Sequence, residues 1–172
     1  SHDTPYTTSL SWLKERLSRY QGARIFVFMH YPISNYAGLR DGEYYGFSSA
    51  STEDDDLLNT ALATQNVVIF NGHTHYKFDC EAEHDIINVY NFQHKKVSLV
   101  HVPSCAYPRD YSKKEQETIS EGYVVEVYEK GVVLRGVDLT ATDISTAYKT
   151  AYEYALTMDN NPSVTETSSI VL

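Results

Sequence analysis

The chain has 172 residues and a formal net charge of −9, and this length allows one domain with a sizeable hydrophobic core. Because no basic stripe offsets the negative charge, the composition argues against a broad nucleic-acid surface. The sequence contains no run of about 18 apolar residues, so no membrane span is expected. Its 15 tyrosines and its Ser, Thr and Asn content slightly favour an extracytoplasmic location, and the compartment stays open.

The first half of the chain is predicted to alternate helices with apolar strands. Leucines at helical spacing predict a helix over residues 9–20. The apolar run 24–29 predicts a strand covered on both faces. A second helix is expected to begin near Ser51, where a hydroxyl cap and the acidic residues after it suit a helix N-terminus. Residues 66–70 then form a second buried strand.

The second half is predicted to consist mainly of strands. These are residues 86–90 and 96–102, followed by a hairpin of residues 121–128 and 131–139. A last helix is expected over residues 143–157, because alanines and tyrosines there fall on one side of a helix. We therefore predict one domain over residues 1–157 and a linker or flexible tail over residues 158–172.

Three further residues have two possible interpretations each. Cys80 and Cys105 have a spacing that suits neither a zinc knuckle nor a redox pair. They could form a disulfide, but two buried free thiols are favoured. His101 alternates with apolar residues in a predicted strand, which favours a packed or hydrogen-bonded histidine over a metal ligand.

A histidine-rich turn follows the strand of residues 66–70. Its sequence is Asn71-Gly72-His73-Thr74-His75. Gly72 permits backbone angles that other residues resist, and imidazole nitrogens are available to bind metal near neutral pH. The alternative is a chance pair of surface histidines, because this pattern alone is only moderately specific.

A third histidine follows the other apolar strand, in His30-Tyr31-Pro32. Two hydrophobic strands that each deliver histidine at the carboxyl end suit an open α/β sheet with a ligand crevice at its strand ends. The loop after His30 carries four candidate substrate-binding residues: Tyr31, Asn35, Tyr36 and Arg40. The Arg40 guanidinium matches phosphate oxygens in geometry, whereas the tyrosines could instead cover the core.

Together these two blocks resemble the last two motifs of the calcineurin-like metallophosphoesterases. The resemblance covers residues 3–138 and is specific in His30-Tyr31-Pro32 and Gly72-His73-Thr74-His75. The family's other motifs, Asp-x-His, Gly-Asp and Gly-Asn-His, do not occur in this sequence. The resemblance therefore implies an α/β fold that is the second half of a four-layer α/β/β/α sandwich, with a mixed sheet flanked by helices.

The resemblance also implies a dinuclear metal site. His30 and His73 would share one ion, and His75 would bind its neighbour. Two such ions acidify a bound water and clamp a phosphate, and imidazole ligands suit Zn, Mn or Fe as divalent or trivalent ions. The general acid and the carboxylate ligands of the family would belong to the absent motifs.

The expected function is hydrolysis of a phosphate ester by the parent protein, with little activity in this chain without its N-terminal half. Its expected partners are that half and a phosphate mono- or diester. Two alternatives stay open. One is a scaffold or binding module of the same fold without catalysis, and the other is a mononuclear zinc site with a structural role.

Overall fold

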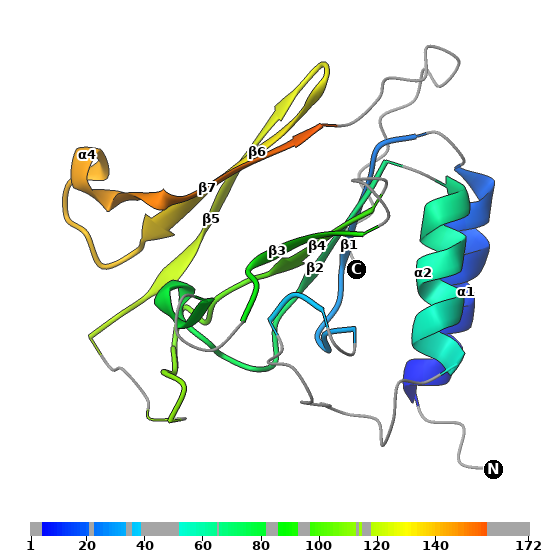
Figure 1. Ribbon diagram of the computed structural model, residues 1–172, viewed down its shortest axis with the longest axis horizontal. Helices are drawn as coiled ribbons and strands as arrows, with labels where there is room; N and C mark the ends of the chain where they lie inside the picture. Colours follow the sequence, from blue (N-terminus) through cyan, green and yellow to red (C-terminus); the bar gives the residue numbers. More distant parts are fainter. Residues whose placement is uncertain are drawn as a thin grey trace.

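The computed structural model describes residues 5–20, 23–33, 36–38, 52–64, 66–81, 86–92, 97–112, 114 and 118–157. Two helices cover one face of a four-stranded sheet, and a three-stranded sheet covers the other face (Figure 1). The helices are α1 (Pro5–Arg19) and α2 (Thr52–Thr64). The predicted mixed α/β class is thus confirmed. No helix in the described ranges is long and apolar enough to cross a membrane.

The four-stranded sheet has the order β1-β2-β4-β3. Its strands are β1 (Ile25–Phe28), β2 (Val67–Asn71), β4 (Val97–His101) and β3 (Val89–Phe92). The first three are parallel, and β3 runs antiparallel to β4. Because parallel strands end at the same edge of a sheet, the residues that follow β1, β2 and β4 meet there.

The two central strands are buried throughout. Val67 and Ile69 of β2 pack in the cluster that includes the helices. Val68 and Phe70 point to the opposite face and pack with the second sheet. A strand covered on both faces is apolar at every position, so the continuous apolar run correctly predicted this environment for β2.

The expectation that β1 is also covered on both faces is wrong at its end. Phe28 is 61% exposed, although its ring stacks on Phe70 at a centroid distance of 4.9 Å. The cause is the position of β1 at the edge of the sheet, where, among the described residues, a strand pairs with it on one side only. The edge of β1 is therefore a surface with apolar character.

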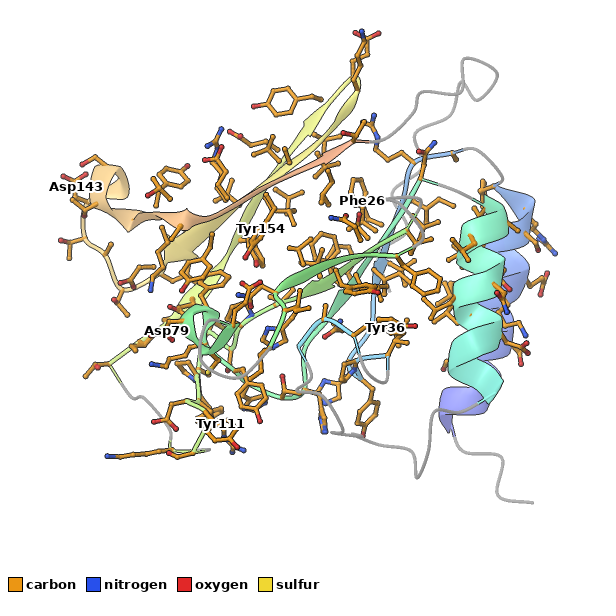
Figure 2. The ribbon with its side chains drawn as sticks, in the orientation of Figure 1. Phe26, Tyr36, Asp79, Tyr111, Asp143 and Tyr154 are labelled. Atoms are coloured by element: carbon orange, nitrogen blue, oxygen red, sulfur yellow. The ribbon has the colours of Figure 1, made fainter. Side chains whose placement is uncertain are left out.

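The second sheet has the order β5-β6-β7 and is antiparallel. Its strands are β5 (Glu121–Tyr128), β6 (Gly131–Asp138) and β7 (Tyr148–Thr157). The predicted hairpin is confirmed as β5 and β6. Phe26 and Tyr154 both pack against the apolar cluster between the two sheets, as Figure 2 shows.

The predicted final helix is wrong. Only α4 (Ile144–Ala147) is helical, and β7 follows it directly. The alanines and tyrosines have helical spacing, but Tyr152, Tyr154 and Leu156 also alternate, and they are the more buried side chains of β7. Pairing with β6 along this stretch satisfies the backbone and buries that alternate set, so the tertiary context selects the strand.

The strand expected at residues 86–90 begins later, at Val89. Asn88 lies just before it and is fully buried. Its side chain donates a hydrogen bond to the carbonyl oxygen of Phe78 in the short helix η1 (Phe78–Cys80) at 3.0 Å. Asn88 therefore ties η1 to the sheet.

Neither cysteine forms a disulfide, which is the alternative that the sequence favoured. Cys80 is buried in η1, whereas Cys105 is exposed. The expectation of two buried thiols is correct only for Cys80, because Cys105 lies on the loop that leaves the sheet after β4.

Candidate metal site

The carboxyl ends of three parallel strands bring four histidines to one edge of the sheet. His30 follows β1, His73 and His75 follow β2, and His101 is the last residue of β4. The Gly72 N–H donates to the carbonyl oxygen of His30 at 3.2 Å. Strand pairing thus continues as far as the histidines and fixes their relative positions.

The two histidines predicted to share an ion face each other. His30 Nε2 and His73 Nδ1 are 3.0 Å apart, and the ring planes are inclined at 75°. Two histidine nitrogens that bind one zinc ion in tetrahedral geometry, each about 2.0–2.1 Å from it, lie about 3.3–3.4 Å apart. Without a cation between them, one nitrogen must carry a proton that the other accepts. The 3.0 Å separation is that of a hydrogen bond between the two rings, and an opening of the pair by about 0.3–0.4 Å would give the spacing of two ligands on one tetrahedral ion.

The described residues do not complete a coordination shell. Within the part of the chain that the structure describes, no group of three or more His, Cys, Asp or Glu side chains could hold a metal ion. The pair fits two ligand positions of one ion. A stable metal site needs further ligands, because the two imidazoles of the pair supply two nitrogen atoms and no oxygen.

The backbone of the histidine turn is unusual. His73 and His75 have positive φ angles of 69° and 62°, in the left-handed region that non-glycine residues seldom occupy. Each such residue costs about 1–3 kcal/mol and is retained where the surroundings impose it, often at functional sites. Gly72, expected to provide the unusual angles, has no positive φ. The turn is therefore strained at the two histidines themselves.

Thr74, between the strained histidines, is fixed by a buried hydrogen bond. Its side chain is 6% exposed, and its Oγ1 lies 3.0 Å from His101 Nε2. His101 is fully buried and hydrogen-bonded, as expected for a strand histidine that is not a ligand. On the far side of the turn, the Arg109 N–H donates to the His75 carbonyl oxygen at 2.7 Å. Hydrogen bonds on both sides therefore hold the turn in place.

Electrostatics favour the neutral, ligating form of His73. Burial lowers the pKa of His73, and the neighbouring His30 and His75 lower it further. Each of these effects disfavours the protonated imidazole. At neutral pH a lone pair is therefore available on this residue.

Two of the four predicted substrate-binding residues lie in the described part of the chain, and their surroundings differ. Tyr31 lies beside the pair, with its ring centroid 4.6 Å from that of His73. Tyr36, labelled in Figure 2, packs on Tyr90 and Phe92 at centroid distances of 4.9 and 5.4 Å, which favours the core-covering alternative for this ring. Asn35 and Arg40 lie outside the described residues.

Sequence reasoning did not identify Tyr107 as a neighbour of the site. Its ring is nearly parallel to that of His75, at 16° and a centroid distance of 6.2 Å, and it is 57% exposed. Its loop follows β4, and Ser104 Oγ shapes that loop by accepting the N–H of Tyr107 at 2.9 Å. Its position after a third parallel strand was the available signal, because such loops gather at the same sheet edge.

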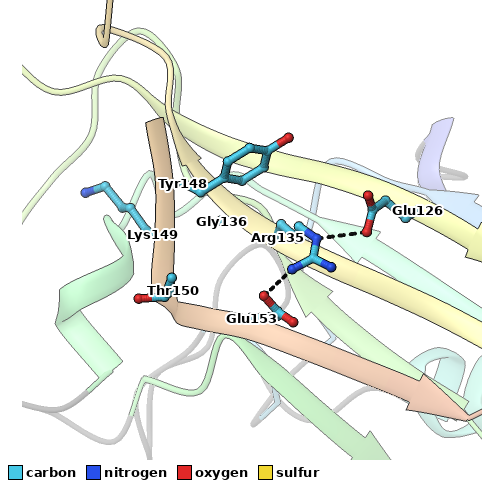
Figure 3. Close-up of a pocket in the computed structure, with 7 residues that line it drawn as sticks. All are labelled: Glu126, Arg135, Gly136, Tyr148, Lys149, Thr150 and Glu153. Carbon is cyan, nitrogen blue, oxygen red and sulfur yellow. Dashed lines mark hydrogen bonds and ion pairs between the residues drawn. The ribbon is translucent and has the colours of Figure 1, made fainter. Parts of the chain in front are cut away.

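A hollow lies on the three-stranded sheet, and none of these histidines lines it (Figure 3). Its volume is about 350 Å³. Arg135 at its base is ion-paired with Glu126 and with Glu153. Lys149 also lines the hollow, so its two cations balance its two carboxylates, and the hollow carries no excess charge for a ligand.

We predict that acid destabilises the protein through His101. Burial, and secondarily His75, lowers its pKa from 6.5 to about 4. Between these values the unfolded chain binds the proton and the folded chain does not, so the free energy of unfolding falls as pH decreases through this window. The effect of His101 should reach about 3 kcal/mol at pH 4, measured by urea unfolding. His101→Gln should lack this component of the pH dependence; an equal slope in both proteins would contradict it.

The geometry of the histidine turn is the evidence on which a functional assignment rests. Comparisons with family models, with curated proteins and with solved structures found no match for the chain.

Proposed function

We propose that this chain is part of a metal-dependent phosphoesterase of the calcineurin-like type. The observation that carries the proposal is the 3.0 Å approach of His30 Nε2 and His73 Nδ1 at the ends of adjacent parallel strands. The strained turn supports it, since backbone strain of this kind concentrates at functional sites. In the proposed fold, the helix and sheet layers belong to an α/β/β/α sandwich whose outer helical layer covers the sheet β5-β6-β7.

The proposed chemistry needs two ions. Ions about 3.5–4 Å apart would acidify a water and stabilise the charge on phosphoryl oxygens. In this proposal His30 and His73 hold one ion and His75 holds the other, and Zn, Mn or Fe suits these imidazole ligands. The role of the three side chains is to position the ions.

The carboxylate ligands would come from a second segment packed against the edge of β1. Arg24 Nη1 and Nη2 donate to the carbonyl oxygens of Tyr128 and Glu129 at 2.6 and 2.8 Å. These bonds place the end of β5 beside the start of β1, and each strand is the edge of its own sheet.

Apolar side chains line this double edge. Phe28 and Val127 are 61% and 55% exposed. Val127 is paired with the buried Val132, so both valines lie on the inner face of their sheet. Unpaired strand edges with apolar side chains favour association. We therefore propose that the segment with the remaining metal ligands extends both sheets here.

Two aromatic rings suggest the form of the substrate. Tyr31 lies against His73 and Tyr107 lies beside His75. Tyr31 is half-buried and Tyr107 is exposed, and aromatic rings stack on flat groups. We propose a phosphate ester that carries a flat group, as a monoester or a diester.

The proposal is tested by metal analysis and by hydrolysis of an aryl phosphate. The natural full-length protein should contain about two equivalents of Zn, Mn or Fe and hydrolyse the ester. The 172-residue chain alone should bind at most one ion and show little hydrolysis. A full-length protein with one ion and no hydrolysis would favour a structural zinc site, and one with no metal would favour a scaffold; either result would contradict the proposal.

A further inference from the structure

We propose that Thr74 and His101 form a positioning pair that holds His73 and His75 in the orientation in which they bind metal. This inference rests on the proposed function, because the residues positioned are the proposed ligands. Neither Thr74 nor His101 is assigned to the ions themselves. The pair acts through the backbone of the turn.

The turn needs such a restraint. His73 and His75 both occupy the left-handed region, where a residue with a Cβ is destabilised by about 1–2 kcal/mol. Relaxation of either residue would swing its imidazole away from the strand ends. Thr74 is the residue between them, and its Oγ1 contacts His101 Nε2 at 3.0 Å. A bond at this position restrains both histidines at once.

The other end of the bond is rigid. His101 belongs to β4, a central strand whose five residues are all buried. Its N–H donates to the Asn88 carbonyl oxygen at 2.8 Å, and the next residue, Val102, donates to the Asn71 carbonyl oxygen at 2.7 Å. The sheet therefore holds the His101 backbone on both neighbouring strands.

The His101 ring is also confined. A Cβ atom added to Gly38 would lie 2.4 Å from His101 Cδ2, so the backbone of Gly38 packs directly on the ring. Gly38 in turn donates its N–H to the Ile87 carbonyl oxygen at 2.9 Å. The imidazole thus has a fixed place between Gly38 and Thr74.

The surroundings select one tautomer of His101. Its Nδ1 is buried and has no hydrogen-bond partner among the described residues. An unpaired buried N–H is rarer in proteins than an under-satisfied acceptor. The proton therefore resides on Nε2, and His101 donates to the Thr74 hydroxyl oxygen. The hydroxyl of Thr74 therefore serves as the acceptor of this bond.

The test compares Thr74→Val with Thr74→Ser in the natural full-length protein. Valine keeps the branched shape and removes the acceptor, whereas serine keeps the acceptor. Affinity for Co²⁺, read from its visible absorption, should fall about 10–100-fold in Thr74→Val, the range found for residues that orient metal ligands. Thr74→Ser should stay within about threefold of wild type.

Thr64→Val is the matched control. Thr64 is also buried, and its hydroxyl donates to the Leu17 carbonyl oxygen at 3.1 Å and to that of Thr60 at 2.8 Å. This variant loses a buried hydroxyl in the helical layer, and its Co²⁺ affinity should be unchanged. A similar loss of affinity in Thr64→Val would assign the effect to general destabilisation and overturn the inference.

Two other results would overturn it: wild-type affinity in Thr74→Val, or an equal loss in Thr74→Ser. If the wild-type protein binds no Co²⁺, the proposed phosphoesterase fails, and imidazole NMR then decides the positioning role separately. A His101 Nε2–H signal present in wild type and Thr74→Ser, but lost in Thr74→Val together with shifts of the His73 and His75 rings, supports the pair. Unshifted His73 and His75 rings overturn it.

Discussion

Replacing His73 with alanine should lower the metal affinity of the full-length protein by at least about 100-fold and abolish hydrolysis of an aryl phosphate. The lower bound follows because residues that merely orient a ligand already contribute 10–100-fold. His73 Nδ1 faces His30 Nε2 at 3.0 Å, so its loss leaves His30 as a single imidazole at that ion. Metal content after gel filtration and the initial rate of hydrolysis measure the two effects.

The pattern across the three histidines sharpens this prediction. His30→Ala should lose the same ion as His73→Ala, whereas His75→Ala should lose the neighbouring one. Leu139→Ala is a suitable control, because this side chain is 56% exposed and follows β6, the central strand of the other sheet. Full metal content and normal hydrolysis in His73→Ala would reject the site.

The sequence predicted those parts of the fold in which local pattern and tertiary environment agree. The apolar run that forms β2 is buried on both faces, and its continuity is typical of a strand covered on both faces. The stretch that forms β7 has two competing periodicities, one helical and one alternating. Local pattern cannot choose between them, and the decision comes from pairing with β6, which is a tertiary contact.

The candidate site likewise has one part that could be predicted from the sequence and another that could not. The approach of His30 to His73 could be predicted, because it requires only that two parallel strands end together. The bond between Thr74 and His101 could not, since it joins residues 27 positions apart in the chain and depends on left-handed angles at His73 and His75. A sequence motif suggests glycine as the source of such angles, but here Gly72 does not adopt them.

Replacement of Gly38 should be far more damaging to stability than replacement of Gly72. Gly38→Ala should lower the free energy of unfolding by about 2–5 kcal/mol. Its φ of 83° contributes about 1–2 kcal/mol of strain for a residue with a Cβ. The added methyl would also lie 2.4 Å from His101 Cδ2, and overpacking of this kind costs about 1–3 kcal/mol. Urea unfolding measures the change.

Gly72→Ala is the matched control, although Gly72 lies in the motif itself. A Cβ added there meets no atom within 4 Å, and its φ is not positive. Its free energy of unfolding should therefore change by no more than about 1 kcal/mol. Gly38→Ala should in addition weaken metal binding, because a displaced His101 can no longer hold Thr74. If Gly38→Ala were as stable as wild type, His101 could move freely, and the strained turn would need another source of rigidity.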